Sequence, residues 1–317
     1  MKLSRLLEFA TNKHNFTKLE HFTDFSQKYI SFSEEGLQAR IVCRKEPEYQ
    51  FWQYKSEGTH NITRPINTDL MLGPDDASRL SSEFHEILAD PRSVRSDKSL
   101  RALIRNGIYT IQQTIGATLD ALPATRSNTA RKLNGDLFER LIQLIIHRAG
   151  VDCKGGTAQV PIVVDGEELC KMNYQHDLMI RLNDELRCIG SVKTSSKDRI
   201  DKIFIDKFLL NKLTGVDTPH IAIFLNDVQR TGKDPLNYRV GSTFLPGHFK
   251  GYTVKLNPLD GVFYCDLRPN MLSDPYLATR ISTIDKFLCE DLWKFLARKG
   301  LAAVKIAEDE DTKELEE

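Results

Sequence analysis

Five residues in the middle of the chain have the types and spacing needed for chemistry on a phosphate. Asp177 lies in the run HDLMIRL, and Ser191 and Lys193 lie in the next run, LRCIGSVK. Asp206 follows Lys193 after twelve intervening residues, and Glu139 lies earlier in the chain. Carboxylates hold hard cations such as Mg²⁺, and an ammonium beside them can offset charge that develops on a phosphate.

The elements expected around these residues could place them at one end of a sheet. The runs 176–182 and 186–193 alternate like strands, and a three-residue loop between them predicts a hairpin. Ser191 and Lys193 share a strand face, because side chains alternate with period two. The segment 196–215 is an amphipathic helix pattern that puts Asp206 about two turns from its start.

The remaining pattern predicts an α/β fold with a mixed β-sheet flanked by helices. Residues 124–150 read as a basic loop leading into a helix that carries Glu139, and residues 75–122 read as largely helical. A C-terminal helix is expected at 283–300. Further strands are expected at 38–44, 49–54, 159–165 and 220–227, with a β pair at 251–256 and 261–267. Residues before 123 combine helices with strands, which predicts an α+β N-terminal region.

The amino-acid composition limits the classes to which this protein can belong. The chain has 317 residues, of which 40% are apolar and 28% charged, as in ordinary globular domains. No apolar run approaches the roughly 18 residues of a membrane helix. The first residues lack a signal-peptide pattern, and the six cysteines form no CxxC pair or zinc spacing. We therefore expect a cytoplasmic protein without membrane contact.

The formal net charge of zero hides an uneven distribution. The last ten residues, EDEDTKELEE, carry −6, so the rest of the chain carries +6. Such a tail is typical of a disordered, solubilising end. The body is thus mildly basic and compatible with a polyanionic partner.

The run from Asp177 through Ser191-Val192-Lys193 to Asp206 resembles the rearranged PD-(D/E)XK nuclease motif. Type II restriction endonucleases of the EcoRII-like group have this form, in which a small residue replaces the acid before the lysine. A carboxylate on the next helix substitutes for that acid. The resemblance implies a restriction-endonuclease-like fold, with Asp177, Asp206 and Glu139 as ligands of Mg²⁺. It also implies that Lys193 orients the attacking water and that Ser191 belongs to the catalytic set.

The helical carboxylate is where this chain departs from the group. The group usually has glutamate there, whereas Asp206 has a shorter side chain. Asp201 is a second candidate for this role, with a spacing that fits the motif less well.

Two further stretches resemble DNA-contacting parts of the same group. Lys197, Asp198 and Arg199 are similar to a basic-acidic-basic triplet that reads guanines and cytosines. Arginine and lysine can donate to guanine, and an acid can accept from cytosine. The upstream stretch TRSNTARK resembles a basic segment whose cations contact phosphates; here these are Arg126, Arg131 and Lys132.

Together these features predict a Mg²⁺-dependent endonuclease that cuts double-stranded DNA at a short G·C-containing site as a homodimer. We expect an accessory or dimerisation region at 1–122, a nuclease domain at 123–307 and a disordered acidic tail at 308–317. Two alternatives remain open. One is a repair or recombination nuclease of the same fold that reads DNA structure, and the other is a DNA-binding protein without catalysis.

Overall fold

The computed structural model describes residues 2–55, 61–197, 199–234, 237–298 and 306–308. Asp198 lies outside these residues, as does all of the acidic tail except Glu308. Within the described residues, no helix is both long enough and apolar enough to cross a bilayer.

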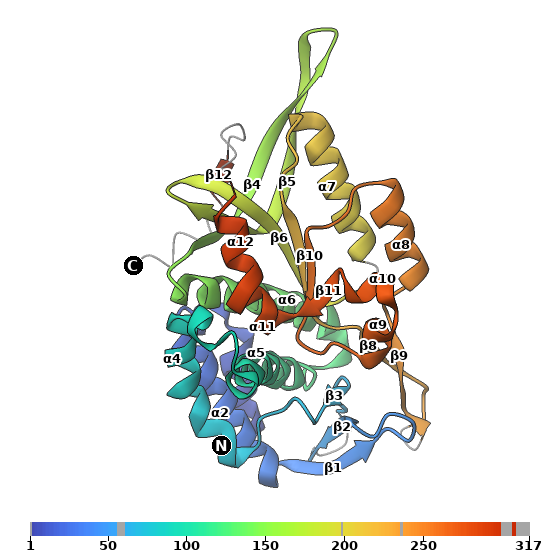
Figure 1. The fold of residues 1–317 in the computed structure, drawn as a ribbon. Coiled ribbons are helices and arrows are strands. Elements are labelled where there is room, and N and C mark those ends of the chain that lie inside the picture. Colours follow the sequence, from blue (N-terminus) through green and yellow to red (C-terminus); the bar gives the residue numbers. More distant parts are fainter. Residues whose placement is uncertain (1, 56–60, 198, 235–236, 299–305, 309–317) are drawn as a thin grey trace.

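A mixed sheet forms the centre of the molecule (Figure 1). In the described part of the chain it has seven strands, in the order β11-β10-β7-β6-β5-β4-β12. Neighbouring strands pair in parallel from β11 through β10 and β7 to β6, and they pair antiparallel from β6 through β5 and β4 to β12. The strands are β4 (Asp152–Val164), β5 (Glu167–Leu182), β6 (Glu185–Ser195), β7 (His220–Asn226), β10 (Gly261–Tyr264), β11 (Ile281–Thr283) and β12 (Ile306–Glu308).

Helices surround this sheet and build most of the N-terminal region (Figure 1). The described helices are α1 (Leu3–Thr11), α2 (Leu19–Glu35), α3 (Pro74–Ala77), α4 (Glu83–Ala89), α5 (Lys98–Leu119), α6 (Ser127–Arg148), α7 (Ile200–Thr214), α8 (Pro246–Lys255), α9 (Pro269–Ser273), α10 (Pro275–Ala278), α11 (Ile284–Lys286) and α12 (Leu292–Leu296), with a π-helical turn at Phe287–Asp291. Two smaller antiparallel sheets accompany them. Their strands are β1 (Leu37–Val42), β2 (Tyr49–Tyr54) and β3 (Ile66–Asn67), and β8 (Val228–Thr231) with β9 (Arg239–Ser242).

Helices α6 and α7 cover opposite faces of the main sheet. Along β7, Ile221 and Ile223 belong to the same core cluster as Leu141 of α6. The alternate residue Phe224 belongs to a second cluster with Phe204 of α7. Because side chains alternate along a strand, each helix seals one face, and charged residues at the strand ends lie between the two.

The largest core cluster joins the N-terminal region to the sheet. It contains Phe22 of α2, Ile111 of α5, Leu141 of α6 and Ile223 of β7, all buried. Residues before and after position 122 therefore share one apolar core.

The predicted fold class is confirmed, and two local predictions are wrong. Residues 251–255 lie in helix α8 instead of a strand, since Phe249 and Thr253 are one turn apart and both buried. The basic stretch before Glu139 is not a loop, because α6 already begins at Ser127. The strand partner expected for 251–256 is also absent: β10 pairs in parallel with β7 and β11.

Candidate active site

The site lies where β5 separates from β6. Pairing between these strands extends from Leu182↔Glu185 to Leu178↔Gly190 and then stops. On the other side of β5, Met179 pairs with Lys154 and His176 pairs with Gly156, so β5 holds one extra residue. This β-bulge lies at Asp177, and such bulges bend a strand and redirect a side chain.

The redirected carboxylate of Asp177 is held by two consecutive residues of β6. The backbone N–H of Val192 donates to Oδ2 of Asp177 at 2.7 Å. The ammonium of Lys193 donates to the same oxygen. Asp177 thereby bridges the gap between the two diverging strands.

Glu139 reaches the same ammonium from helix α6. Lys193 Nζ donates to Oε1 of Glu139 at 3.0 Å. Burial, together with the negative charge of Asp177, raises the pKa of Glu139 to about 7, although Lys193 opposes this. Burial acts to lower the pKa of Lys193, but the two carboxylates outweigh it and raise that pKa. The cluster therefore contains two acids around one cation.

Gln143 completes this cluster and was missed by the sequence analysis. It lies four residues after Glu139 on α6, and its Nε2 donates to the backbone oxygen of Asp177 at 2.8 Å. Gln143 and Glu139 share one face of the helix, so the four-residue spacing was the available signal. Gly155 of β4 lies beside this contact, and a Cβ atom there would come within 3.3 Å of Gln143 Nε2.

Ser191 lies on the α7 side of the sheet, buried beside a histidine. Its Oγ is 3.3 Å from Nε2 of His220, which is fully buried. His176, next to Asp177, packs edge-on against His220, and burial lowers the pKa of His176 to about 4. These histidines are neutral parts of the packing.

Asp206 also lies on the α7 side, near His176 but with a partner of its own. Lys202 Nζ donates to Oδ2 of Asp206 at 2.7 Å. The charge of Asp206 acts on His176 and Tyr174 of β5, and His176 also feels the charge of Asp177. In the described residues, no hydrogen bond or ion pair links Asp206 to Asp177, Glu139 or Lys193.

The structure thus brings three of the proposed catalytic residues into direct contact: Glu139, Asp177 and Lys193. Asp206 and Asp177 both act electrostatically on His176. Across the described ranges, no three His, Cys, Asp or Glu side chains are arranged around a common metal position.

The proposed DNA-contacting cations are exposed. Lys197 and Arg199 lie between β6 and α7, and the N–H of Lys197 donates to Ser195 Oγ at 3.2 Å. Asp198 lies outside the described residues. At the start of α6, Arg126 and Arg131 are exposed, and exposed Lys132 pairs with Asp136 at 2.7 Å.

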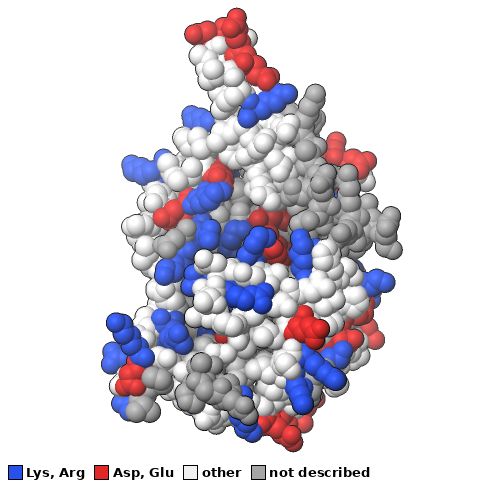
Figure 2. Space-filling model, turned by 180° about the vertical axis from the view of Figure 1, so that it is seen from behind, with Lys and Arg blue, Asp and Glu red and all other residues white. Residues whose placement is uncertain are grey.

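Lys and Arg side chains gather on one face of the molecule. Figure 2 shows them around a hollow in the middle of this face, with acidic side chains inside the hollow. Such an arrangement focuses positive potential on a polyanionic ligand.

Comparisons with known proteins bear on the fold. No known family model matches the chain, and no curated protein does. Among solved structures, the type IIP restriction endonuclease Kpn2I is similar, with a TM-score of 0.66 and 15% sequence identity, over 95% of this chain and 99% of that chain. The complex of restriction endonuclease PspGI with substrate DNA matches with a TM-score of 0.40 and 12% identity, over 68% of this chain and 92% of that chain. The chain therefore has a fold similar to that of a type IIP restriction endonuclease along nearly its whole length.

Proposed function

We propose that the chain is a type II restriction endonuclease that hydrolyses double-stranded DNA at a short G·C-containing site. One observation carries the proposal. A lysine and two carboxylates, Lys193, Asp177 and Glu139, meet where β5 leaves β6 in a sheet of the restriction-endonuclease type.

The residues of the cluster fit a divalent cation. Asp177 and Glu139 supply hard oxygen donors, which Mg²⁺ prefers. Burial and the negative charge of Asp177 raise the pKa of Glu139 despite Lys193, so a second cation beside Glu139 would favour its charged form. Asp206, on the next helix, is the third ligand in this proposal. A Mg²⁺ ion bound there would offset the charge of the scissile phosphate and lower the barrier to its hydrolysis.

The chain's own groups position the reaction. The Val192 N–H fixes the carboxylate of Asp177, and Gln143 fixes the backbone of the same residue. Lys193 is held by both acids, so its ammonium can orient a water or stabilise charge on the phosphate. Ser191 keeps the position two residues before Lys193 small and uncharged.

DNA binding is assigned to the exposed cations beside this cluster. Lys197, Asp198 and Arg199 would read base edges at the start of α7. The α6 cations Arg126, Arg131 and Lys132 would contact phosphates, which position the protein without specifying sequence. Cutting both strands of a symmetric site favours a homodimer, with residues 1–122 as the accessory or dimerisation region.

Digestion of a plasmid tests the proposal. We expect discrete fragments in Mg²⁺ and intact plasmid in EDTA. Lys193→Ala should leave the plasmid intact, whereas Lys212→Ala, at an exposed lysine on α7, should cut like the parent. A smear would favour the nuclease that reads DNA structure. Mg²⁺-independent binding without any cleavage would favour the non-catalytic protein.

A further inference from the structure

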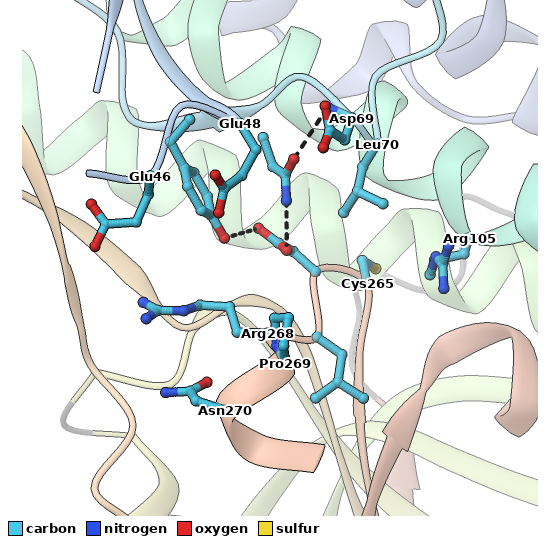
Figure 3. Close-up of a pocket in the computed structure, with 13 residues that line it drawn as sticks. Glu46, Glu48, Asp69, Leu70, Arg105, Cys265, Arg268, Pro269 and Asn270 are labelled. Carbon is cyan, nitrogen blue, oxygen red and sulfur yellow. Dashed lines mark hydrogen bonds between the residues drawn. The ribbon is translucent and has the colours of Figure 1, made fainter. Parts of the chain in front are cut away.

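A polar cavity lies where the N-terminal region meets the end of β10. Its volume is about 420 Å³. One wall comes from the segment before and at the start of β2, including Glu46 and Tyr49. The other comes from the segment that follows β10, including Asp266, Arg268 and Asn270 (Figure 3).

This cavity lies at the same end of the parallel strands as Lys193. Lys193 of β6 pairs with Phe224 of β7, which pairs with Tyr264 of β10. Neighbouring strands are about 4.8 Å apart, so the backbones of Lys193 and Tyr264 are roughly 10 Å apart across the sheet. Asp266 follows two residues beyond Tyr264. Successive base pairs of a duplex are about 3.4 Å apart. The distance of roughly 10 Å therefore corresponds to about three base pairs of a duplex that lies along these strand ends.

The floor of the cavity is fixed by a buried carboxyl group. Tyr49 Oη donates to Oδ2 of Asp266 at 2.8 Å, and Asn67 Nδ2 donates to Oδ1 at 3.0 Å (Figure 3). These groups satisfy one another, so they hold the walls in place and leave little free hydrogen-bonding capacity.

Arg268, at the mouth, has unused hydrogen-bonding capacity, and its side chain is 20% exposed. Arg268 Nη1 is buried without a hydrogen-bond partner in the described structure. Its Nε lies 3.9 Å from Oδ1 of Asp227, and that fully buried oxygen has no described hydrogen-bond partner either. A buried donor without a partner is costly, so a ligand that accepts from Arg268 would recover this energy.

The mouth also combines the groups that distinguish base pairs. Figure 3 shows the side chains of Glu46, Arg268 and Asn270 on one side of the cavity, away from Arg105. A guanidinium donates to O6 and N7 of guanine, and a carboxylate accepts from N4 of cytosine.

We propose that this mouth reads a G·C base pair of the DNA outside the pairs read by Lys197 and Arg199. Arg268 contacts the guanine, and Glu46 contacts the cytosine. This assignment rests on the proposed nuclease function. It adds residues on either side of the cavity to those that determine which DNA sequence is recognised.

Cleavage of a pool of duplexes with randomised sequence tests the assignment, with the cut ends read by sequencing. The parent should require G·C at one outer position of its site. Arg268→Ala and Glu46→Gln should each relax that position by roughly 5- to 100-fold and leave the other positions unchanged. Arg105→Ala, on the far side of the same cavity, is the control and should keep the parental preference.

Two further variants separate base reading from other roles. Arg268→Lys keeps the charge but loses the forked donors, so it should relax the same position. Parental preference in this variant would mean a phosphate contact and would overturn the assignment. Glu46→Gln, at the proposed cytosine contact, tests the same base pair if Arg268→Ala fails to fold.

The outcomes distinguish this assignment from the function on which it rests. A parent that cuts at discrete sites, with unchanged preferences in folded Arg268→Ala and Glu46→Gln, overturns the assignment and leaves the nuclease function standing. A parent that cuts no DNA overturns both.

Discussion

Asp177 accepts hydrogen bonds from two consecutive residues of β6, the backbone N–H of Val192 at 2.7 Å and the ammonium of Lys193. The N–H of Val192 would otherwise be left without a strand partner on this side, because pairing with β5 has already ended at Gly190. One carboxylate therefore both closes the open end of the ladder and positions the lysine. At this fork, the point where β5 separates from β6, the structure and the proposed chemistry depend on the same oxygen.

The first prediction separates these two roles of Asp177. Asp177→Asn retains an oxygen that can accept from Val192, so its thermal midpoint should stay close to that of the parent. Its cleavage rate in Mg²⁺ should fall by at least about 100-fold, because a ligand worth several kcal/mol is lost. Asp177→Ala should lose both activity and stability, since the Val192 N–H then has no acceptor.

Thermal melts and plasmid cleavage measure the two effects on the same samples. Asp184→Asn, in the turn of the same hairpin, is the matched control and should match the parent in both. Parental cleavage by Asp177→Asn would remove Asp177 from the set of metal ligands.

The second prediction concerns Asp206, which pairs with Lys202 in the structure. If Asp206 is the helical ligand, Asp206→Asn should reduce cleavage by at least about 100-fold. Lys202→Met should cut nearly as well as the parent, because an exposed ion pair contributes only about 0–1 kcal/mol. Asp201→Asn, on the same helix, tests the second candidate. Loss of cleavage in Asp201→Asn with parental activity in Asp206→Asn would exchange their roles.

The third prediction concerns the phosphate contacts of α6. Arg131→Ala should weaken binding in Ca²⁺ equally on specific and random duplexes, because a phosphate contact carries no sequence information. The slope of log affinity against log salt should become less steep by about one. DNA-binding titrations at several salt concentrations measure this slope. A loss confined to the specific duplex would instead make Arg131 a base contact.

The fourth prediction concerns the pH dependence of stability. Burial raises the pKa of Asp266 from 3.8 to about 6, although hydrogen bonds from Tyr49 and Asn67 act to lower it. Between these pH values the folded chain keeps a proton that the unfolded chain loses. The stability from this group is therefore complete below about pH 4 and is lost as the pH rises through 6.

Comparison with Asp266→Asn isolates this contribution. The stability of the parent relative to the variant should decline by on the order of 1–3 kcal/mol from pH 4 to pH 7. Denaturant unfolding at several pH values measures the difference. A difference that stays constant with pH would mean that Asp266 titrates normally.

Some of the fold could be predicted from local patterns alone. The turn after Leu182 has Asn183 and Asp184 at positive φ, where these residue types are tolerated, and it forms the expected hairpin. Gly215, at φ 68°, ends α7 as the sequence indicates. The strand prediction for 251–256 is wrong because this segment contains Tyr and Val, which favour strands, whereas tertiary packing that buries Phe249 and Thr253 favours the helix.

Part of the candidate site could also be predicted from local sequence patterns. Period two put Ser191 and Lys193 on one face, but Ser191 contacts a buried histidine while Lys193 extends into the fork. The bulge at Asp177 depends on pairing with β4 and leaves no local sequence signal, so the redirection of that side chain could not be predicted. The cavity at Arg268 joins residues about 200 positions apart, which spacing cannot reveal.

Cleavage by Lys193→Ala is the measurement that tests the central claim most directly. The variant and the parent are incubated with the same site-containing DNA, first in Ca²⁺ to measure binding and then in Mg²⁺ to measure cutting. The arrangement of Lys193 between Asp177 and Glu139 predicts site-specific binding without cleavage. Parental cleavage by this variant would contradict the assignment of the fork as the active site.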